Sequence, residues 1–161
     1  MIILVMGVTG SGKTTVGTLL AAQMGWRFAD ADGFHPPANV EKMSHAIPLT
    51  DADRIPWLEA IHQQMVTWNA TGTSGVITCS ALKKSYRELL LRDLDVKLIY
   101  LHGSEAVIAA RVAARVGHFA KADLVASQFV DLQEPDDAIE VEVDHTPEEI
   151  VAEIRQRLGL N

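Results

Sequence analysis

Short apolar runs alternate with longer amphipathic stretches along the whole chain. Runs of strand type occur at residues 2–6, 27–29, 75–79, 97–101 and 138–143. They show little polar alternation, as strands do when both faces of a sheet are covered. Between them, apolar residues recur every three to four positions, which is the helical period. Helices are expected at residues 13–24, 36–45, 51–68, 83–92, 105–116 and 146–158. The alternation predicts an α/β fold, a three-layer structure around a parallel sheet.

The composition narrows the class of protein. The 161 residues contain no repeat, low-complexity tract or linker, so we expect a single domain spanning residues 1–161. The formal net charge of −7 argues against nucleic acid or anionic membranes as partners, because their capture needs a basic surface. The chain has one cysteine, Cys79, and no apolar run of the roughly twenty residues that a membrane helix requires. A cytoplasmic protein is therefore expected.

Residues 7–14 form a complete phosphate-binding motif, G-x-x-x-x-G-K-T. A strand-like run precedes the motif and a helical pattern follows it, which is the context that the motif requires. The loop N–H groups and the N-terminus of the following helix attract phosphate oxygens. Lys13 is expected to bridge the β- and γ-phosphates, and the Thr14 hydroxyl to hold Mg²⁺. The residues expected to contact the nucleotide in this segment are Gly7, Thr9, Gly10, Ser11, Gly12, Lys13, Thr14 and Thr15.

Two classes of phosphate-loop protein compete, a GTPase or motor ATPase and a small-molecule kinase. The guanine motif N-K-x-D is absent, and the third strand runs into Cys79 and Ser80 without a Walker B aspartate. Asp30, after the second strand, is then the nearest carboxylate for Mg²⁺, with turn capping as its alternative role. Asp32 is a candidate to orient an acceptor hydroxyl and take its proton, although a loose transition state asks little of a base. For His35, a substrate contact and a capping role are equally open.

Cationic side chains gather near the same predicted edge of the sheet, where ligands bind in open parallel sheets. The set consists of Arg54, Lys83, Lys84 and Arg87. Arginine holds a carboxylate with two hydrogen bonds and aspartate accepts hydroxyl protons, so the edge suits a small acidic polyol. Arg54 has an alternative role in a salt bridge to Asp51 or Asp53. Lys83 and Arg87 have the spacing of one helical face, but the choice between Lys83 and Lys84 as a substrate contact stays open.

With these residues in view, the whole chain resembles the gluconate kinase (gluconokinase) family of short phosphate-loop kinases. The strings that carry the resemblance are GVTGSGKTT, DADGFHPPANVEKM, PLTDADRIPWL, CSALKKSYR, ARVGHF and QFVDLQEP. The first is shared by many kinases, whereas the next three together are far more specific. The resemblance implies that ATP and Mg²⁺ are used to phosphorylate D-gluconate to 6-phospho-D-gluconate in gluconate catabolism. It also implies a nucleoside-monophosphate-kinase-like P-loop fold, a helical lid at about residues 117–135, and a homodimer.

Roles for the residues around the lid follow from the resemblance. It implies adenine stacking for Arg111 and phosphate contact for Arg115, with a solvated cationic face as the alternative. His118 either contacts gluconate or caps the lid helix, and Gln128 is a weaker substrate candidate. The predicted catalytic residues are thus Lys13, Asp32, Arg54 and Arg115. The predicted substrate-binding residues are Asp32, His35, Arg54, Lys83, Lys84, Arg87, His118 and Gln128, and the predicted metal-binding residues are Thr14 and Asp30.

Three other functions are less consistent with the residues. Shikimate kinases share the loop and the D-x-D after the second strand, but they carry a glycine triplet where this chain has residues 79–84. A nucleoside monophosphate kinase would need nucleotide-acceptor motifs that are missing. A regulatory nucleotide-binding module without turnover would have no use for Asp32, Arg54 and Lys83 together.

Overall fold

The computed structural model describes residues 1–116 and 119–161, with side chains for residues 1–115 and 124–161. Five parallel strands form one sheet in the order β2-β3-β1-β4-β5. The strands are β1 (Ile2–Met6), β2 (Arg27–Asp30), β3 (Gly75–Thr78), β4 (Val96–His102) and β5 (Ile139–Glu142). Each agrees with a predicted run to within one residue at either end.

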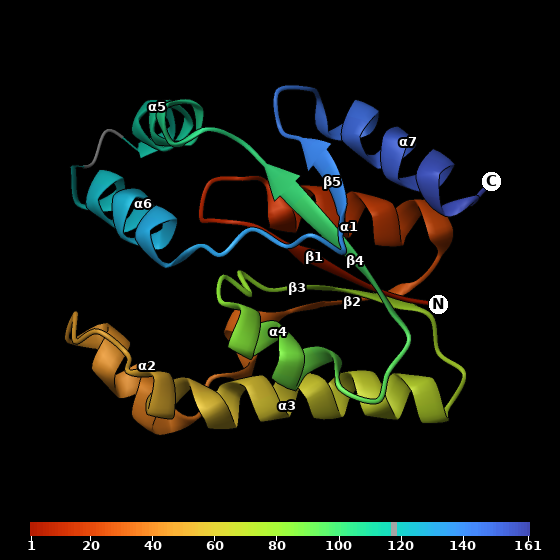
Figure 1. Ribbon diagram of the computed structural model, residues 1–161, viewed down its shortest axis with the longest axis horizontal. Helices are drawn as coiled ribbons and strands as arrows, with labels where there is room; N and C mark the ends of the chain where they lie inside the picture. The colour runs from red at the N-terminus through yellow and green to blue at the C-terminus, as the bar shows by residue number, and fades with distance from the viewer. Residues whose placement is uncertain (117–118) are drawn as a thin grey trace.

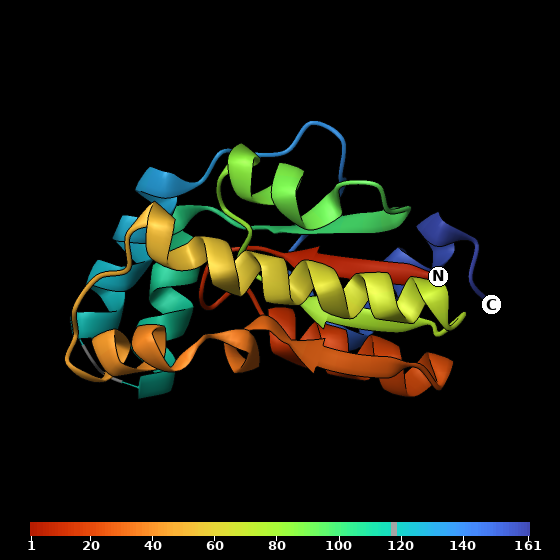
Figure 2. The same cartoon turned by 90° about the horizontal axis from the view of Figure 1, so that it is seen from below.

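Helices cover both faces of this sheet, as Figure 1 shows. They are α1 (Lys13–Met24), α2 (Pro37–Ser44), α3 (Asp51–Ala70), α4 (Lys84–Leu91), α5 (Glu105–Val116), α6 (Phe119–Asp131) and α7 (Pro147–Leu158), with a short 3-10 helix η1 (Ala31–Phe34). One layer contains α1, α5 and α7, and the other contains α3 and α4 (Figure 1). The views in Figures 1 and 2 place α2, α5 and α6 at the end toward which the strands run.

The central strand β1 explains why the sequence shows apolar runs instead of alternation. All five of its residues are buried. Ile3 and Val5 pack with the layer of α1, α5 and α7, while Leu4 and Met6 pack with α3 and α4. A strand that is buried on both faces has no position for a polar side chain. The sheet therefore has two cores, one on each face.

The starts of α1, α2 and α4 lack a side-chain cap, and of these α1 is the one that follows the phosphate-binding motif. Thr50 caps α3 in a reciprocal pair with Asp53, and Thr146 caps α7 in the same way. By contrast α1, which the structure describes in full, has neither a side-chain cap nor an acidic residue in its first turn. Its N-terminus is thus suited to an anion. In the described part of the chain, no helix has the length and apolar character needed to span a membrane.

Candidate active site

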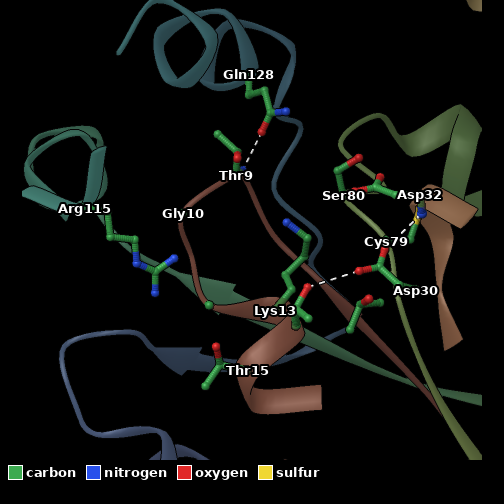
Figure 3. A pocket seen from close by; sticks show the side chains of 13 residues that line it. Thr9, Gly10, Lys13, Thr15, Asp30, Asp32, Cys79, Ser80, Arg115 and Gln128 are labelled. Carbon is green, nitrogen blue, oxygen red and sulfur yellow. Dashed lines mark hydrogen bonds between the residues drawn. The ribbon is translucent and has the colours of Figure 1, made fainter. Parts of the chain in front are cut away.

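A cavity of about 280 Å³ opens where β1, β2 and β3 end (Figure 3). Its lining residues are Thr9, Gly10, Gly12, Lys13, Thr14, Thr15, Asp30, Asp32, Thr78, Cys79, Ser80, Arg115 and Gln128. All but Thr78, Cys79 and Ser80 are residues that the sequence predicted to bind nucleotide, metal or substrate. The parallel topology explains the assembly, because it brings the carboxyl ends of separate strands to one edge.

Two glycines give the phosphate loop its shape. Gly10 and Gly12 have φ angles of 80° and 92°, in the region that side chains rarely adopt. A Cβ on Gly10 would also lie 2.5 Å from Cγ2 of Val112 on α5, whereas a Cβ on Gly12 would meet nothing within 4 Å. Gly10 is thus required for both conformation and packing, and Gly12 for conformation alone.

Lys13 lies inside the loop. Its Nζ donates a hydrogen bond of 3.1 Å to the carbonyl of Val8. Burial lowers the pKa of Lys13, although the charges of Asp32 and Asp30 act in the opposite direction. A partly desolvated ammonium interacts more strongly with an anion than one in bulk water does. The geometry therefore fits the predicted phosphate contact.

Thr14 and Asp30 meet across the cavity, with 3.2 Å between Oγ1 of Thr14 and Oδ2 of Asp30. The other carboxylate oxygen of Asp30 accepts a hydrogen bond of 2.9 Å from the Asp32 N–H and so caps η1. The capping role is therefore seen directly, and it leaves Oδ2 facing the loop. A hydroxyl and a carboxylate oxygen are ligand types that Mg²⁺ prefers, so these residues fit the ion.

A second cavity of about 310 Å³ lies on the other side of the phosphate loop. It is lined by Ser11, Gly12, Thr15, Val16, Arg111, Ala114, Arg115, His145, Pro147 and Ile150. Arg115 lines both cavities, whereas Arg111 lines only this one and donates a hydrogen bond to the carbonyl of Val143. The second cavity has an apolar wall formed by Val16, Pro147 and Ile150, which suits a flat base. Arg115 lies at the boundary between this cavity and the phosphate-loop cavity.

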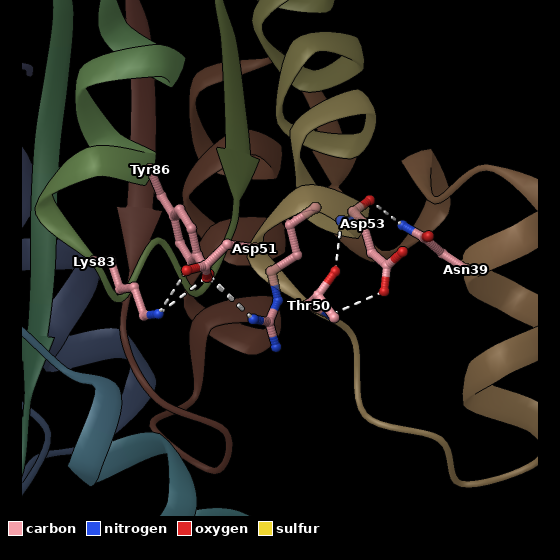
Figure 4. Close-up of polar contacts among 7 residues, drawn as sticks. Asn39, Thr50, Asp51, Asp53, Lys83 and Tyr86 are labelled. Carbon is pink, nitrogen blue, oxygen red and sulfur yellow. Dashed lines mark hydrogen bonds and ion pairs between the residues drawn. The ribbon is translucent and has the colours of Figure 1, made fainter.

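Arg54, which is predicted to contact the acceptor, belongs to a charged cluster at the start of α3 and α4. Figure 4 labels its partners Asp51, Lys83 and Tyr86. Asp51 lies 3.0 Å from Nζ of Lys83 and 3.9 Å from Nη1 of Arg54, and accepts a hydrogen bond from the Tyr86 hydroxyl. Arg54 also donates to the Tyr86 oxygen at 3.1 Å. The hydrogen bonds from Tyr86 and Lys83 lower the pKa of Asp51, so this carboxyl stays ionised and holds the cations together. We call Asp51, Arg54, Lys83 and Tyr86 the acid-binding cluster, after the role proposed for them below.

A neighbouring set of contacts fixes the loop that carries Asp32. His35 stacks on Trp57 with 4.4 Å between ring centroids, and the Trp57 indole donates to the carbonyl of Ala31 at 2.7 Å. Burial lowers the pKa of His35, while the charge of Asp32 raises it and that of Arg54 lowers it. The imidazole of His35 is therefore close enough to Asp32 and Arg54 for each charge to shift its pKa. Trp57 is buried in the core and also positions η1.

Lys84 and Arg87 are not brought to the phosphate-loop cavity. They line a separate cavity of about 470 Å³ with Glu88, Leu91, Arg92 and residues 133–137. Lys83 is the N-cap residue of α4 and has extended backbone angles, so the helical i, i+4 geometry expected for Lys83 and Arg87 does not apply. Lys83 instead faces Asp51, which separates the roles of the two lysines.

Two lid residues complete the predicted set. Gln128 on α6 accepts a hydrogen bond of 2.6 Å from the Thr9 N–H through Oε1, so it contacts the phosphate loop. His118 lies outside the described residues. The sequence analysis did not single out Tyr86, although it lies three residues after Lys83 in the same string. It is buried, yet its hydroxyl reaches the cluster.

Comparison with known proteins separates two related possibilities. A family model described as shikimate kinase matches residues 9–158. The solved shikimate kinase from Aquifex aeolicus is only 16% identical, with a TM-score of 0.61 over 99% of this chain and 96% of that one, so the likeness shows the fold alone.

Similarity to gluconokinases is much higher. The gluconokinase of Gluconobacter oxydans (strain 621H) is 46% identical over 94% of this chain and 88% of its own. The crystal structure of a gluconokinase from Sinorhizobium meliloti 1021 is 40% identical, with a TM-score of 0.83 over 98% of this chain and 94% of that one. The chain therefore belongs to the gluconokinase family, within the wider set of phosphate-loop kinases that the shikimate kinase model covers.

Proposed function

We propose that the protein transfers the γ-phosphoryl group of ATP to D-gluconate and releases 6-phospho-D-gluconate and ADP. One observation carries this proposal beyond family membership. The phosphate loop with Asp32 and the acid-binding cluster are formed by separate segments that lie at the same edge of the sheet, although no residue of the cluster lines the phosphate-loop cavity. A sugar acid needs both, because its reacting hydroxyl and its carboxylate lie at opposite ends of the molecule.

On the nucleotide side, the loop N–H groups and Lys13 bind the β- and γ-phosphates. Arg115 stabilises the phosphates from the boundary of the two cavities, and Arg111 lies beside the space for adenine. Thr14 and Asp30 are the residues that would hold Mg²⁺. When bound, the ion neutralises negative charge on the β- and γ-oxygens.

On the acceptor side, Arg54 and Lys83 hold the gluconate carboxylate, and His35 contacts the polyol chain. Asp32 accepts a hydrogen bond from the primary hydroxyl and orients its oxygen toward the γ-phosphorus. The bond between that oxygen and phosphorus forms as the bond from phosphorus to the β,γ-bridging oxygen breaks. The hydroxyl proton passes to Asp32. Positioning accounts for most of the expected contribution, because the transition state is loose.

We further propose that α6 forms part of a lid at about residues 117–135 and that the protein acts as a cytoplasmic homodimer. Lid closure over both substrates would exclude water, a smaller competitor for the γ-phosphate. The contact between Gln128 and Thr9 supports the lid, because it joins α6 to the loop. Light scattering of the purified protein tests the dimer, and a monomeric mass would refute it.

The experiment that tests the function is coupled ADP release with ATP and Mg²⁺. The acceptors are D-gluconate, shikimate and AMP, with one sample that contains no acceptor. We expect rapid turnover with gluconate only. Turnover with shikimate or AMP instead would overturn the substrate assignment, and nucleotide binding without turnover on any acceptor would overturn the assignment as a kinase.

A further inference from the structure

The start of α4, which contributes Lys83 and Tyr86 to the acid-binding cluster, is capped by a residue that follows α6. Lys83, the N-cap residue of α4, makes no side-chain capping bond. The N–H of Lys84 instead donates to Oε1 of Gln133 at 2.7 Å, and Gln133 lies two residues after the end of α6. A capping acceptor that comes from a distant segment fixes two elements relative to each other. The first turn of α4 is therefore held to the segment that follows α6.

The backbone of Gln133 adds two more bonds to the same region. Its N–H donates to the carbonyl of Leu82 at 2.8 Å, and its carbonyl accepts from Nη2 of Arg87 at 2.7 Å. Arg87 is buried and also donates to the carbonyls of Ala81 and Leu82. A buried guanidinium is costly unless its donors are satisfied, and here carbonyls from both segments satisfy them. Arg87 thus joins residues 81–82 to Gln133.

The segment of residues 128–133, which ends at Gln133, contacts the phosphate loop at its other end. Gln128 accepts from the Thr9 N–H, five residues before Gln133. Residues 128–133 therefore contact the phosphate loop at one end and the start of α4 at the other. Lys83 and Tyr86, which lie at the start of α4, contact Asp51 and Arg54. Hydrogen bonds joined by short stretches of backbone therefore run from Thr9 through residues 128–133 to the acid-binding cluster.

We propose that Gln133, together with Arg87, is a positioning residue that couples nucleotide binding to sugar-acid binding. The proposal rests on the proposed function, since it takes the acid-binding cluster as the site of the gluconate carboxylate. When phosphate binding moves the phosphate loop and α6, Gln133 moves with them. Its hydrogen bond to the Lys84 N–H then moves the start of α4, and Lys83 with it. By linkage, each substrate then strengthens the binding of the other by the same factor.

The test measures the dissociation constant of D-gluconate by calorimetry, with and without a non-hydrolysable ATP analogue and Mg²⁺. In the unsubstituted protein we expect the analogue to tighten gluconate binding by about fivefold or more, in the usual range of coupling between sites. Gln133→Leu keeps the size but removes the acceptor oxygen, so the ratio should fall to below about twofold. Gln133→Glu keeps an acceptor for the Lys84 N–H and should retain the coupling.

Arg92→Gln is the matched control. Arg92 lines the cavity of about 470 Å³ together with Gln133, but it pairs with Glu59 on α3. Among the described residues it makes no hydrogen bond to Gln133. It should leave the ratio unchanged. Gln133→Leu that retains the coupling, or that loses thermal stability alone, overturns the proposal. If the unsubstituted protein phosphorylates gluconate but shows no coupling, this inference fails while the proposed function stands. If it does not phosphorylate gluconate, both fail.

Discussion

The two halves of the proposed site are built by different means. The nucleotide half is one continuous segment that presents its backbone, with Gly10 and Gly12 in left-handed conformations and an uncapped helix behind them. The acceptor half is a cluster of side chains from two helices, in which Asp51 is paired with Arg54, Lys83 and Tyr86. The first half depends on backbone geometry, and the second depends on charge.

This difference determines how each half responds to change. A binding site made of backbone N–H groups tolerates substitution of neighbouring side chains. It does not tolerate a change in the loop conformation, because φ and ψ fix the direction of its donors. The side-chain cluster can lose one cation and keep its other pairs, since Asp51 contacts Arg54, Lys83 and Tyr86 separately. We therefore expect substitutions in the loop to act on the rate and on folding, and substitutions in the cluster to act on acceptor affinity.

The largest effect should follow from Lys13→Met. Removing the cation that neutralises the transferring phosphoryl group should lower kcat by about 10³-fold, the scale seen when a preorganised electrostatic group is lost. Steady-state ADP release measures this. Lys97→Met is the control, because Lys97 lies on β4 and pairs with Asp95 at 3.6 Å, away from the site. A kcat within tenfold of the original would contradict the role of Lys13.

Arg54→Gln should act on the acceptor side alone. Loss of a charged hydrogen bond to the gluconate carboxylate should raise KM for gluconate by about 10- to 100-fold. KM for ATP should change by less than about threefold if the two halves are as distinct as their contacts suggest. Initial rates with each substrate varied in turn separate these constants. Equal changes in both would show that Arg54 serves the nucleotide as well.

Gly10→Ala and Gly12→Ala separate conformation from packing within the loop. Gly12→Ala should cost about 1–2 kcal/mol of unfolding free energy, because it strains the backbone only. Gly10→Ala should cost about 2–4 kcal/mol, since its methyl group also meets Cγ2 of Val112. Urea unfolding followed by circular dichroism gives both values. Equal losses would mean that α5 moves away without cost.

The smallest effect concerns acid stability near the acid-binding cluster. The hydrogen bond from Lys42, with help from the Thr50 N–H, lowers the pKa of Asp53 to about 2 from an ordinary 3.8. A lowered pKa in the folded state stabilises the protein above the unfolded value, and this contribution disappears as the pH falls from about 4 to about 2.

Asp53→Asn should therefore be less stable than the original protein by a constant amount above about pH 4, and the difference should vanish toward pH 2. Thermal unfolding at several pH values measures this difference. Asp95→Asn serves as the control, because Asp95 is exposed and makes only a 3.6 Å pair with Lys97. A difference that stays constant down to pH 2 would show that Asp53 acts without its charge.

The two halves also differ in how far the sequence alone predicts them. The loop residues are contiguous, so the motif specifies their order, their spacing and the helix that follows. The strands could be predicted because burial on both faces removes polar residues from them. The acid-binding cluster depends on how α3 and α4 pack, and one sequence carries no signal for that packing. The spacing of Lys83 and Arg87 suggested a shared face because the sequence does not show that α4 begins only after Lys83.

The remaining differences have the same origin. Asp51 was considered only as a salt-bridge partner of Arg54, yet it lies at the centre of the cluster. Arg87 was predicted to contact substrate because it is cationic, but it is buried and satisfied by carbonyls. Local patterns reveal charge and periodicity. They do not reveal which of several cations a distant carbonyl will bind.

Cys79 has a practical consequence for studying the lid. It is the single cysteine of the chain, it is buried at the end of β3, and burial raises the pKa of its thiol to about 12. Only a thiolate reacts rapidly with maleimides, so the native protein should resist them. An exposed position on α6 such as Leu124 can then be changed to cysteine and coupled to a fluorophore without first removing Cys79. The closure of α6 that is proposed above then becomes observable by fluorescence in a protein that differs at one surface residue.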